Sequence, residues 1–85
     1  MASYRIQIRR SAEREIEKLP DKERKKIITR IEGLRDDPRP PGTKKLSGEE
    51  KYRLRQGTYR ILYEVNDAIV TVVVVKVADR KDAYR

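Results

Sequence analysis

Two kinds of hydrophobic pattern follow each other in the first third of the chain. Apolar and polar residues alternate over residues 4–9 (YRIQIR), which predicts a half-buried strand. Apolar residues then recur at helical spacing in two stretches, first Ala12, Ile16 and Leu19, and then Ile27, Ile28, Ile31 and Leu34. Pro20 separates the two stretches, and Ser11 and Asp21 stand where we expect helix N-caps. The patterns predict a strand and then two helices that pack as an antiparallel or angled hairpin.

The spacing of apolar residues changes from helical to alternating at residue 51. The stretch before it, residues 36–48 (DDPRPPGTKKLSG), is rich in proline and glycine and is predicted to be an irregular loop. Strands are expected from residue 51, at residues 59–65 and at residues 69–77, with tight turns at RQGT and NDA between them. The last of these strands is apolar on both faces, which is typical of a strand in the middle of a sheet.

These elements predict one α+β domain over residues 1–85. Its order is an N-terminal strand, a helical hairpin and a three-stranded antiparallel meander, with the helices on one face of the sheet. Apolar residues make up 36% of the chain and charged residues 42%, so the core must be thin. The polar tail, residues 78–85 (ADRKDAYR), is expected to lie beside the sheet edge.

The formal net charge of +8 favours an anionic partner, such as nucleic acid, an acidic protein or a membrane surface, although solubility alone would also explain it. The chain has no cysteine and no histidine, so we expect no cofactor and no metal site, and the usual general base near neutral pH is missing. No apolar stretch reaches the roughly 20 residues of a membrane span, and the N-terminus lacks the apolar core of a signal peptide. We therefore expect a cytoplasmic protein with no membrane partner.

The segment KYRLRQGTYRILYEV, residues 51–65, carries most of the candidate chemistry. Arg53 and Arg55 point the same way by the period of two, and Arg60 follows on the next strand after a tight turn. Cross-strand neighbours have Cβ atoms about 5 Å apart, so three guanidinium groups are expected to crowd one patch. Such groups match phosphate oxygens with two parallel hydrogen bonds. A solvated strand face is the alternative explanation.

Further cations flank this hairpin and could extend the patch into a groove that follows a phosphate backbone. They are Lys44, Lys45 and Lys51 before it, and Lys76, Arg80, Lys81 and Arg85 after it. Tyr84 is an aromatic residue in a polar tail, which suits stacking on an unpaired base, or packing back onto the sheet rim. Nucleophilic catalysis by serine has no base here, and no glycine-rich phosphate loop is present.

Three segments together, KKLSG, YRLRQGTYRILYEV and ADRKDAY, resemble the RelE toxins of the RelE/ParE superfamily. The resemblance covers essentially the whole chain and implies a RelE-like fold. It implies a metal-independent endoribonuclease, or mRNA interferase, that cuts messenger RNA in the ribosomal A site through attack of a ribose 2′-OH on the adjacent phosphate. It also implies that a small acidic antitoxin holds the toxin inactive, and that the two proteins bind operator DNA together.

The family's catalytic positions fall on Arg53, Arg55, Arg60, Arg80 and Tyr84. The resemblance implies that Arg60 and Arg80 stabilise the charge of the phosphorane, that Arg80 assists the leaving group, and that Tyr84 stacks on a base and orients the 2′-OH. Lys44, Lys45, Lys51, Lys81 and Arg85 are then expected to bind RNA. The chain has one residue after Tyr84, so we expect it to lack the C-terminal helix of some relatives and expect the antitoxin to cover the basic face directly.

One departure from the family concerns the general base. The best-known member has lysine at the two second-strand positions, where this chain has Arg53 and Arg55, and arginine is a poor proton acceptor. Water, the tyrosine oxygen, or a carboxylate of Glu49, Glu50 or Asp82 could accept the proton instead. We therefore expect an enzyme that is slower than its relatives or that uses a different general base. The other functions that the resemblance leaves open are a ParE-type inhibitor of DNA gyrase and an RNA- or ribosome-binding module without catalysis.

Overall fold

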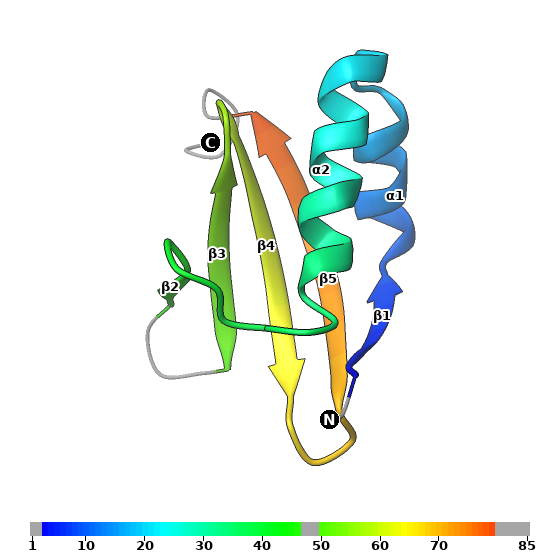
Figure 1. Cartoon of the computed structure of the whole chain (residues 1–85). Coiled ribbons are helices and arrows are strands. Elements are labelled where there is room, and N and C mark those ends of the chain that lie inside the picture. The colour runs from blue at the N-terminus through cyan, green and yellow to red at the C-terminus, as the bar shows by residue number, and fades with distance from the viewer. Residues whose placement is uncertain (1–2, 47–49, 80–85) are drawn as a thin grey trace.

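A computed structural model describes residues 3–46 and 50–79 of the chain (Figure 1). The elements in chain order are β1 (Arg5–Ile8), α1 (Arg10–Glu17), α2 (Asp21–Gly33), β2 (Lys44–Lys45), β3 (Lys51–Gln56), β4 (Tyr59–Asn66) and β5 (Thr71–Asp79). The strands form one sheet in the order β1-β5-β4-β3-β2. β1 pairs with β5 in parallel and all other pairs are antiparallel. The predicted α+β fold with its three-stranded meander is confirmed.

Both helices lie on one face of the sheet, as predicted, and we call the opposite face the open face (Figure 1). Every second residue of the central strands points toward the helices and is buried there, because side chains alternate across a sheet. The buried cluster joins apolar residues of the helices and of the turn after α2 with apolar residues and tyrosines of the strands. Its members are Ala12, Ile16, Ile27, Ile31, Leu34, Tyr52, Leu54, Ile61, Tyr63, Val65, Val72, Val74 and Val77. Within the described residues, neither helix is long and apolar enough to cross a membrane.

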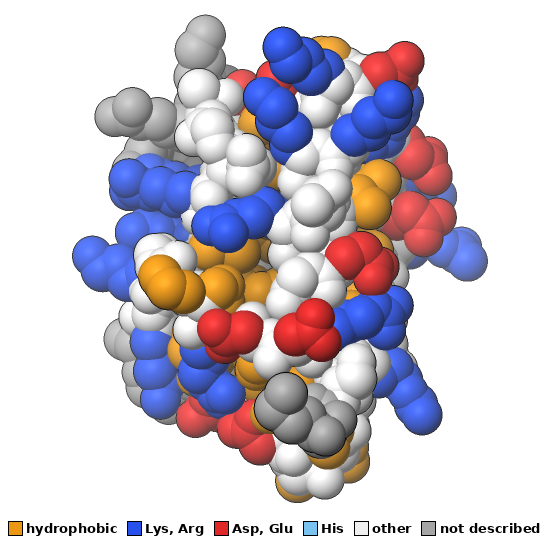
Figure 2. Space-filling model, viewed as in Figure 1, with side chains coloured by type: hydrophobic (Ala, Val, Ile, Leu, Met, Phe, Trp, Pro, Cys, Tyr) orange, Lys and Arg blue, Asp and Glu red, His pale blue; other side chains and the backbone are white. Residues whose placement is uncertain are grey.

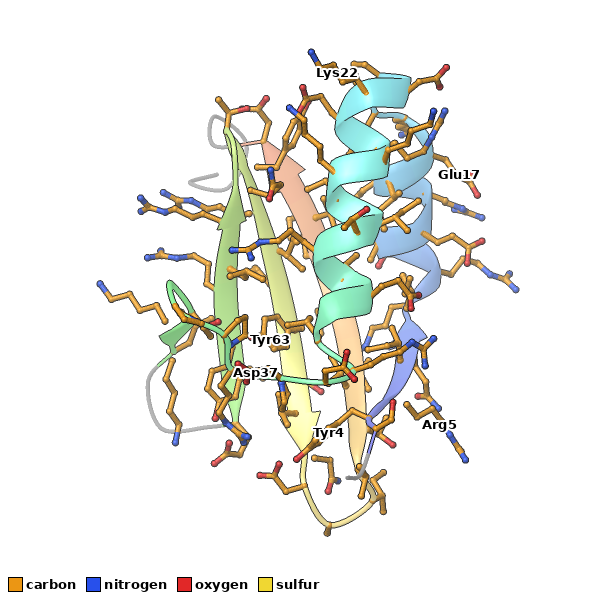
Figure 3. All side chains as sticks on the ribbon, in the orientation of Figure 1. Tyr4, Arg5, Glu17, Lys22, Asp37 and Tyr63 are labelled. Carbon is orange, nitrogen blue, oxygen red and sulfur yellow. The ribbon has the colours of Figure 1, made fainter. Side chains whose placement is uncertain are left out.

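The segment between α2 and β2 crosses the helix side of the sheet (Figure 1) and is held there by Tyr63 of β4. The Tyr63 hydroxyl donates a hydrogen bond of 2.7 Å to the carbonyl oxygen of Pro38, and Figure 3 shows Tyr63 beneath this segment beside Asp37. The Tyr63 ring stacks on Tyr52, with ring centroids 5.7 Å apart. This segment therefore closes the core where the helices leave β3 and β4 uncovered.

Four local expectations are corrected by the structure. Arg9 and Pro20, not Ser11 and Asp21, precede the first helical residue, and neither makes a side-chain capping bond. Ile28 is 44% exposed, because α2 turns the face with Ile27, Ile31 and Leu34 to the core. The loop over residues 36–48 contains a short strand, β2, which pairs with β3 at the sheet edge. The last strand begins at Thr71 rather than at Ile69, since a four-residue turn occupies 67–70.

Val70 in this turn is the one non-glycine residue, among those described, with a positive φ, at 49°. A β-branched side chain in the left-handed region costs roughly 1–2 kcal/mol, whereas asparagine tolerates it better. We expect Val70→Asn to raise the free energy of unfolding by about 0.5–1 kcal/mol, measured by urea denaturation. Ile69→Asn, an exposed neighbour with ordinary φ, is the control and should give no gain. A Val70→Asn chain less stable than this control would contradict the account.

Candidate functional site

The predicted arginine cluster lies on the open face of the β3–β4 hairpin. The strand register places Arg55 directly opposite Arg60, and Arg53 opposite Leu62. Arg53 and Arg55 share this face because they are two residues apart on β3. The register thus confirms that Arg55 and Arg60 are cross-strand neighbours and that Arg53 lies on the same face, two residues along β3.

The turn between the two strands is as short as a hairpin allows. Gln56 pairs with Tyr59, so the loop consists of Gly57 and Thr58, and Gly57 has a φ of +61°. A type II′ turn requires a positive φ at this first position, which glycine adopts without strain. A small hollow of about 80 Å³ opens at the turn, lined by Arg55, Arg60 and the turn residues. The tight turn therefore fixes the distance between the two opposed arginines.

The three arginines differ in burial in a way that the sequence did not show. Arg55 is exposed and Arg53 is half-buried, while Arg60 is only 6% exposed. Among the described residues, Arg60 is the one charged side chain that is buried. A guanidinium stays charged at all ordinary pH values, and burial strengthens its attraction for an anion. The cluster therefore combines a fixed, desolvated cation with two more accessible ones.

The predicted RNA-binding lysines divide into two groups. Lys44 pairs with Arg53 across β2 and β3 and extends the arginine cluster at the sheet edge. Lys45 lies opposite Tyr52, with its Nζ 3.4 Å from a Glu50 oxygen, and Lys51 has its Nζ 3.9 Å from a Glu64 oxygen. Figure 2 shows Lys and Arg side chains along the β2–β3 edge, with apolar side chains between this edge and α2.

Four of the predicted site residues, Arg80, Lys81, Tyr84 and Arg85, lie outside the described residues. Two of the proposed carboxylate bases, Glu49 and Asp82, lie outside them as well. The third, Glu50, accepts hydrogen bonds from the Tyr52 hydroxyl at 2.5 Å and from Arg39 at 3.1 Å. The Tyr52 hydroxyl first, and then Arg39, hold the pKa of Glu50 below its usual value. Glu50 is thus a poor proton acceptor.

Glu64 is an acidic residue on the open face that the sequence analysis did not single out. It lies opposite Lys51 on the same face as Arg60, four residues along β4, or about 13 Å at the rise of a strand. The alternation of Arg60, Leu62 and Glu64 in the sequence was the pattern that could have placed Glu64 on the same face as Arg60. At that distance Glu64 does not reach a phosphate held between Arg55 and Arg60.

A polar network around Arg39, which no sequence pattern indicated, fastens the α2–β2 segment to the turn before β5. Arg39 donates hydrogen bonds to the Tyr52 hydroxyl at 2.8 Å, to Glu50 and to Asp67 at 2.8 Å, and its guanidinium lies 5.1 Å from the centroid of the Tyr52 ring. The Tyr4 hydroxyl donates to Asp67 at 2.6 Å. The turn that carries Asp67 lies at the end of the sheet away from the β3–β4 turn (Figure 1), which favours a structural role for the network.

This network predicts a loss of stability in acid. Hydrogen bonds from Arg39 first, and then from Tyr4, hold the pKa of Asp67 below its usual value, as those from Tyr52 and Arg39 do for Glu50. The folded state therefore favours both charged carboxylates, so their contribution is present above pH of about 4 and is lost as the pH falls through the lowered values. Thermal melts should show this fall, and Asp67→Asn should make it shallower. Asp36→Asn, which removes a carboxylate from the α2–β2 segment instead, should not.

Comparison with known proteins places this arrangement in a family. The sequence profile described as the ParE toxin of the type II toxin–antitoxin system parDE matches residues 6–84. The toxin RelG of Mycobacterium tuberculosis is 33% identical over 86 residues, which cover 96% of this chain and 97% of that protein.

Solved structures of toxin–antitoxin complexes have the same fold. A chain of the RelBE2 complex from Mycobacterium tuberculosis superposes with a TM-score of 0.80 at 30% identity, over 92% of this chain and 99% of that one. A chain of the intact Escherichia coli RelBE complex also has a TM-score of 0.80, over 91% and 96% of the two chains; at 24% identity it bears on the fold alone. The likeness in sequence and in fold thus extends over nearly the whole chain.

Proposed function

Since the chain belongs to the ParE toxin family of type II toxin–antitoxin systems, within the RelE/ParE superfamily, we propose that it is an endoribonuclease that cleaves messenger RNA on the ribosome. The observation that carries the proposal is the pair Arg55 and Arg60, directly opposed across the hairpin, with Arg53 beside them. A gathering of cations on one sheet face is costly unless an anion completes it. A phosphodiester is the anion that fits three guanidinium groups.

In the proposed reaction, the 2′-oxygen forms a bond to phosphorus while the bond from phosphorus to the 5′-oxygen breaks. Negative charge grows on the two non-bridging oxygens during this step. The buried guanidinium of Arg60 and the opposed Arg55 are placed to hydrogen-bond those oxygens, and fixed donors of this kind act mainly by electrostatic stabilisation. Arg53 and Lys44 would hold the neighbouring phosphate. Arg80 and Tyr84 keep the roles that the resemblance implies.

The proton of the 2′-OH needs an acceptor other than the arginines. Glu50 is engaged by Tyr52 and Arg39, and Glu64 is about 13 Å from Arg60. We propose water, the Tyr84 oxygen or Asp82 as the acceptor. Because arginine is a poor proton acceptor, the reaction should be slower than in relatives with lysine at the second-strand positions.

We also propose an acidic antitoxin as the partner that covers the open face. The RelBE2 relative is a toxin–antitoxin complex, and the open face of this chain carries clustered arginines that an acidic segment would neutralise. Binding of operator DNA by the two proteins together follows the same resemblance.

Inhibition of DNA gyrase is the second candidate function, because the matching family profile is that of ParE toxins. The two candidates are separated by adding the purified protein to a translating extract and, in parallel, to gyrase with relaxed plasmid. We expect translation to stop with cut messenger RNA and supercoiling to continue. Blocked supercoiling with intact messenger RNA would overturn the endonuclease and support the gyrase inhibitor.

A further inference from the structure

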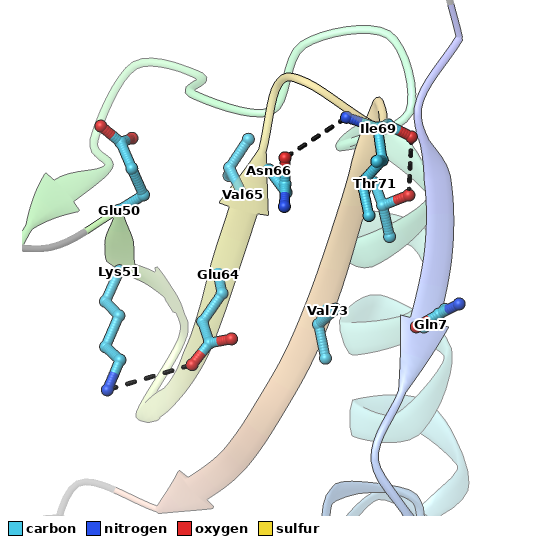
Figure 4. Close-up of a pocket in the computed structure, with 9 residues that line it drawn as sticks. All are labelled: Gln7, Glu50, Lys51, Glu64, Val65, Asn66, Ile69, Thr71 and Val73. Carbon is cyan, nitrogen blue, oxygen red and sulfur yellow. Dashed lines mark hydrogen bonds and ion pairs between the residues drawn. The ribbon is translucent and has the colours of Figure 1, made fainter.

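A second feature of the open face is a groove of about 360 Å³ at the opposite end from the arginine hairpin. Figure 4 shows that Gln7 of β1, Lys51 of β3, Glu64 of β4 and Val73 of β5 line it. The turn after β4 closes one end, where Asn66 and Ile69 stand. The lining is apolar at Val65, Ile69 and Val73 and polar elsewhere, and Glu50 is a second carboxylate in it.

The carboxylate of Glu64 lies between two cations, and neither of them is close enough to form a hydrogen bond with it. Its Oε1 lies 3.8 Å from an Arg9 guanidinium nitrogen and its Oε2 lies 3.9 Å from the Lys51 ammonium. Both distances exceed those of a hydrogen bond, so these ion pairs leave both oxygens able to accept one. Arg9 lies on one side of the carboxylate and Lys51 on the other, so the two cations orient it on the sheet surface.

The turn at the end of the groove is held in a costly conformation that presents an apolar side chain. The exposed side chain is that of Ile69, at 66% exposure, and the costly conformation is the positive φ of the next residue, Val70. The Asn66 side chain accepts hydrogen bonds from the backbone of Ala68 and Ile69, and Thr71 donates one to the Ile69 carbonyl, so the turn is fixed. Strain of this kind is typical of ligand-binding segments.

Charge connects the groove to the arginine cluster. Among the described residues that the strand register or a contact with Glu64 places on the open face, the acid is Glu64 and the cations are Arg5, Arg9, Lys44, Lys51, Arg53, Arg55, Arg60 and Lys76. A polyanion is therefore favoured along this face. The groove, with the carboxylates of Glu64 and Glu50 in its lining, suits a group that donates hydrogen bonds rather than a phosphate. The distance of about 13 Å between Arg60 and Glu64 along β4 can be spanned by about four stacked nucleotides.

We infer that this groove holds a guanine base of the same RNA strand whose phosphate lies at the arginine cluster, an inference that rests on the proposed function. The guanine edge offers two adjacent N–H donors and one carbonyl acceptor. The two Glu64 oxygens accept the donors, and the Lys51 ammonium beside them donates to the carbonyl. Adenine and uracil lack this order of groups, and a well-placed bidentate contact discriminates about 10- to 100-fold between bases. Glu64 is a specificity-determining residue in this account.

The direct test is binding of short single-stranded RNAs, blocked against cleavage by 2′-O-methyl groups, measured by fluorescence anisotropy. We expect a guanine-containing RNA to bind the wild-type chain about 10- to 100-fold more tightly than its adenine counterpart, with inosine, which lacks the exocyclic amine, in between. Glu64→Gln should lose this preference. Glu17→Gln removes the same charge from α1, where Glu17 points away from the strands (Figure 3), and should keep the preference for guanine.

Equal binding of the guanine and adenine RNAs by the wild-type chain, binding of neither, or full preference in a folded Glu64→Gln chain would each overturn the inference. Cleavage of ribosome-bound messenger RNA separates the two claims. Cutting without regard to guanine would leave the endonuclease standing and remove the base site. Guanine-dependent binding without any cutting would keep the base site and remove the proposed function.

Discussion

Arg60→Ala is expected to lower the rate of messenger RNA cleavage by about 100- to 1,000-fold, the effect of removing one fixed donor from a developing oxyanion. The loss should be this large because Arg60 is buried, so its guanidinium acts on the phosphate with little screening by water. Single-turnover cleavage of a ribosome-bound message measures it. Arg60→Lys keeps the charge but not the planar fork, and should fall between alanine and the wild type.

Because Arg60 is buried, each variant must first be shown to fold by its thermal melt. Arg14→Ala on α1 is the matched control, since it removes one exposed arginine from the helical side of the molecule and should leave the rate unchanged. A folded Arg60→Ala chain that cleaves as fast as the control would remove Arg60 from the proposed mechanism.

Tyr63→Ala is expected to lower the free energy of unfolding by about 3–5 kcal/mol, a large part of the roughly 5–15 kcal/mol available to a small domain. The Tyr63 ring is 1% exposed and stacks on Tyr52, and its hydroxyl holds the Pro38 carbonyl. Burial raises the pKa of this hydroxyl, which therefore remains a donor at neutral pH. Urea denaturation followed by circular dichroism measures the change.

Tyr63→Phe separates the ring from the hydroxyl in the same experiment. It removes only the hydrogen bond to Pro38, so its cost should be about 1–2 kcal/mol, most of it from the carbonyl left without a donor. If Tyr63→Phe were as destabilising as Tyr63→Ala, the hydrogen bond rather than the packed ring would hold the α2–β2 segment.

The order of elements and the arginine hairpin could be predicted because both depend on local periodicity. A period of two places Arg53 with Arg55, and Gly57 marks the turn that brings Arg60 opposite Arg55. The valine-rich segment was correctly predicted to lie in the middle of the sheet because it is apolar on both faces, and it lies between β1 and β4.

Features that depend on distant contacts were not visible in the sequence. The burial of Arg60 and the network of Arg39 with Tyr4, Glu50 and Asp67 join segments far apart in the chain. β2 was hidden in a proline-rich stretch because two lysines at a sheet edge carry no hydrophobic pattern. The predicted caps were wrong because α1 begins at Arg10 and α2 at Asp21, so that Arg9 and Pro20 occupy the cap positions and neither makes a side-chain bond.

The most direct test of the central claim uses purified ribosomes stalled with a defined codon in the A site. Wild-type protein is added, and the message is mapped by primer extension, with the same RNA free of ribosomes as the control. We predict one cut within the A-site codon, a 2′,3′-cyclic phosphate on the upstream fragment, and no cut in the free RNA. An intact message on the ribosome, or equal cutting of free RNA, would contradict a ribosome-dependent endonuclease.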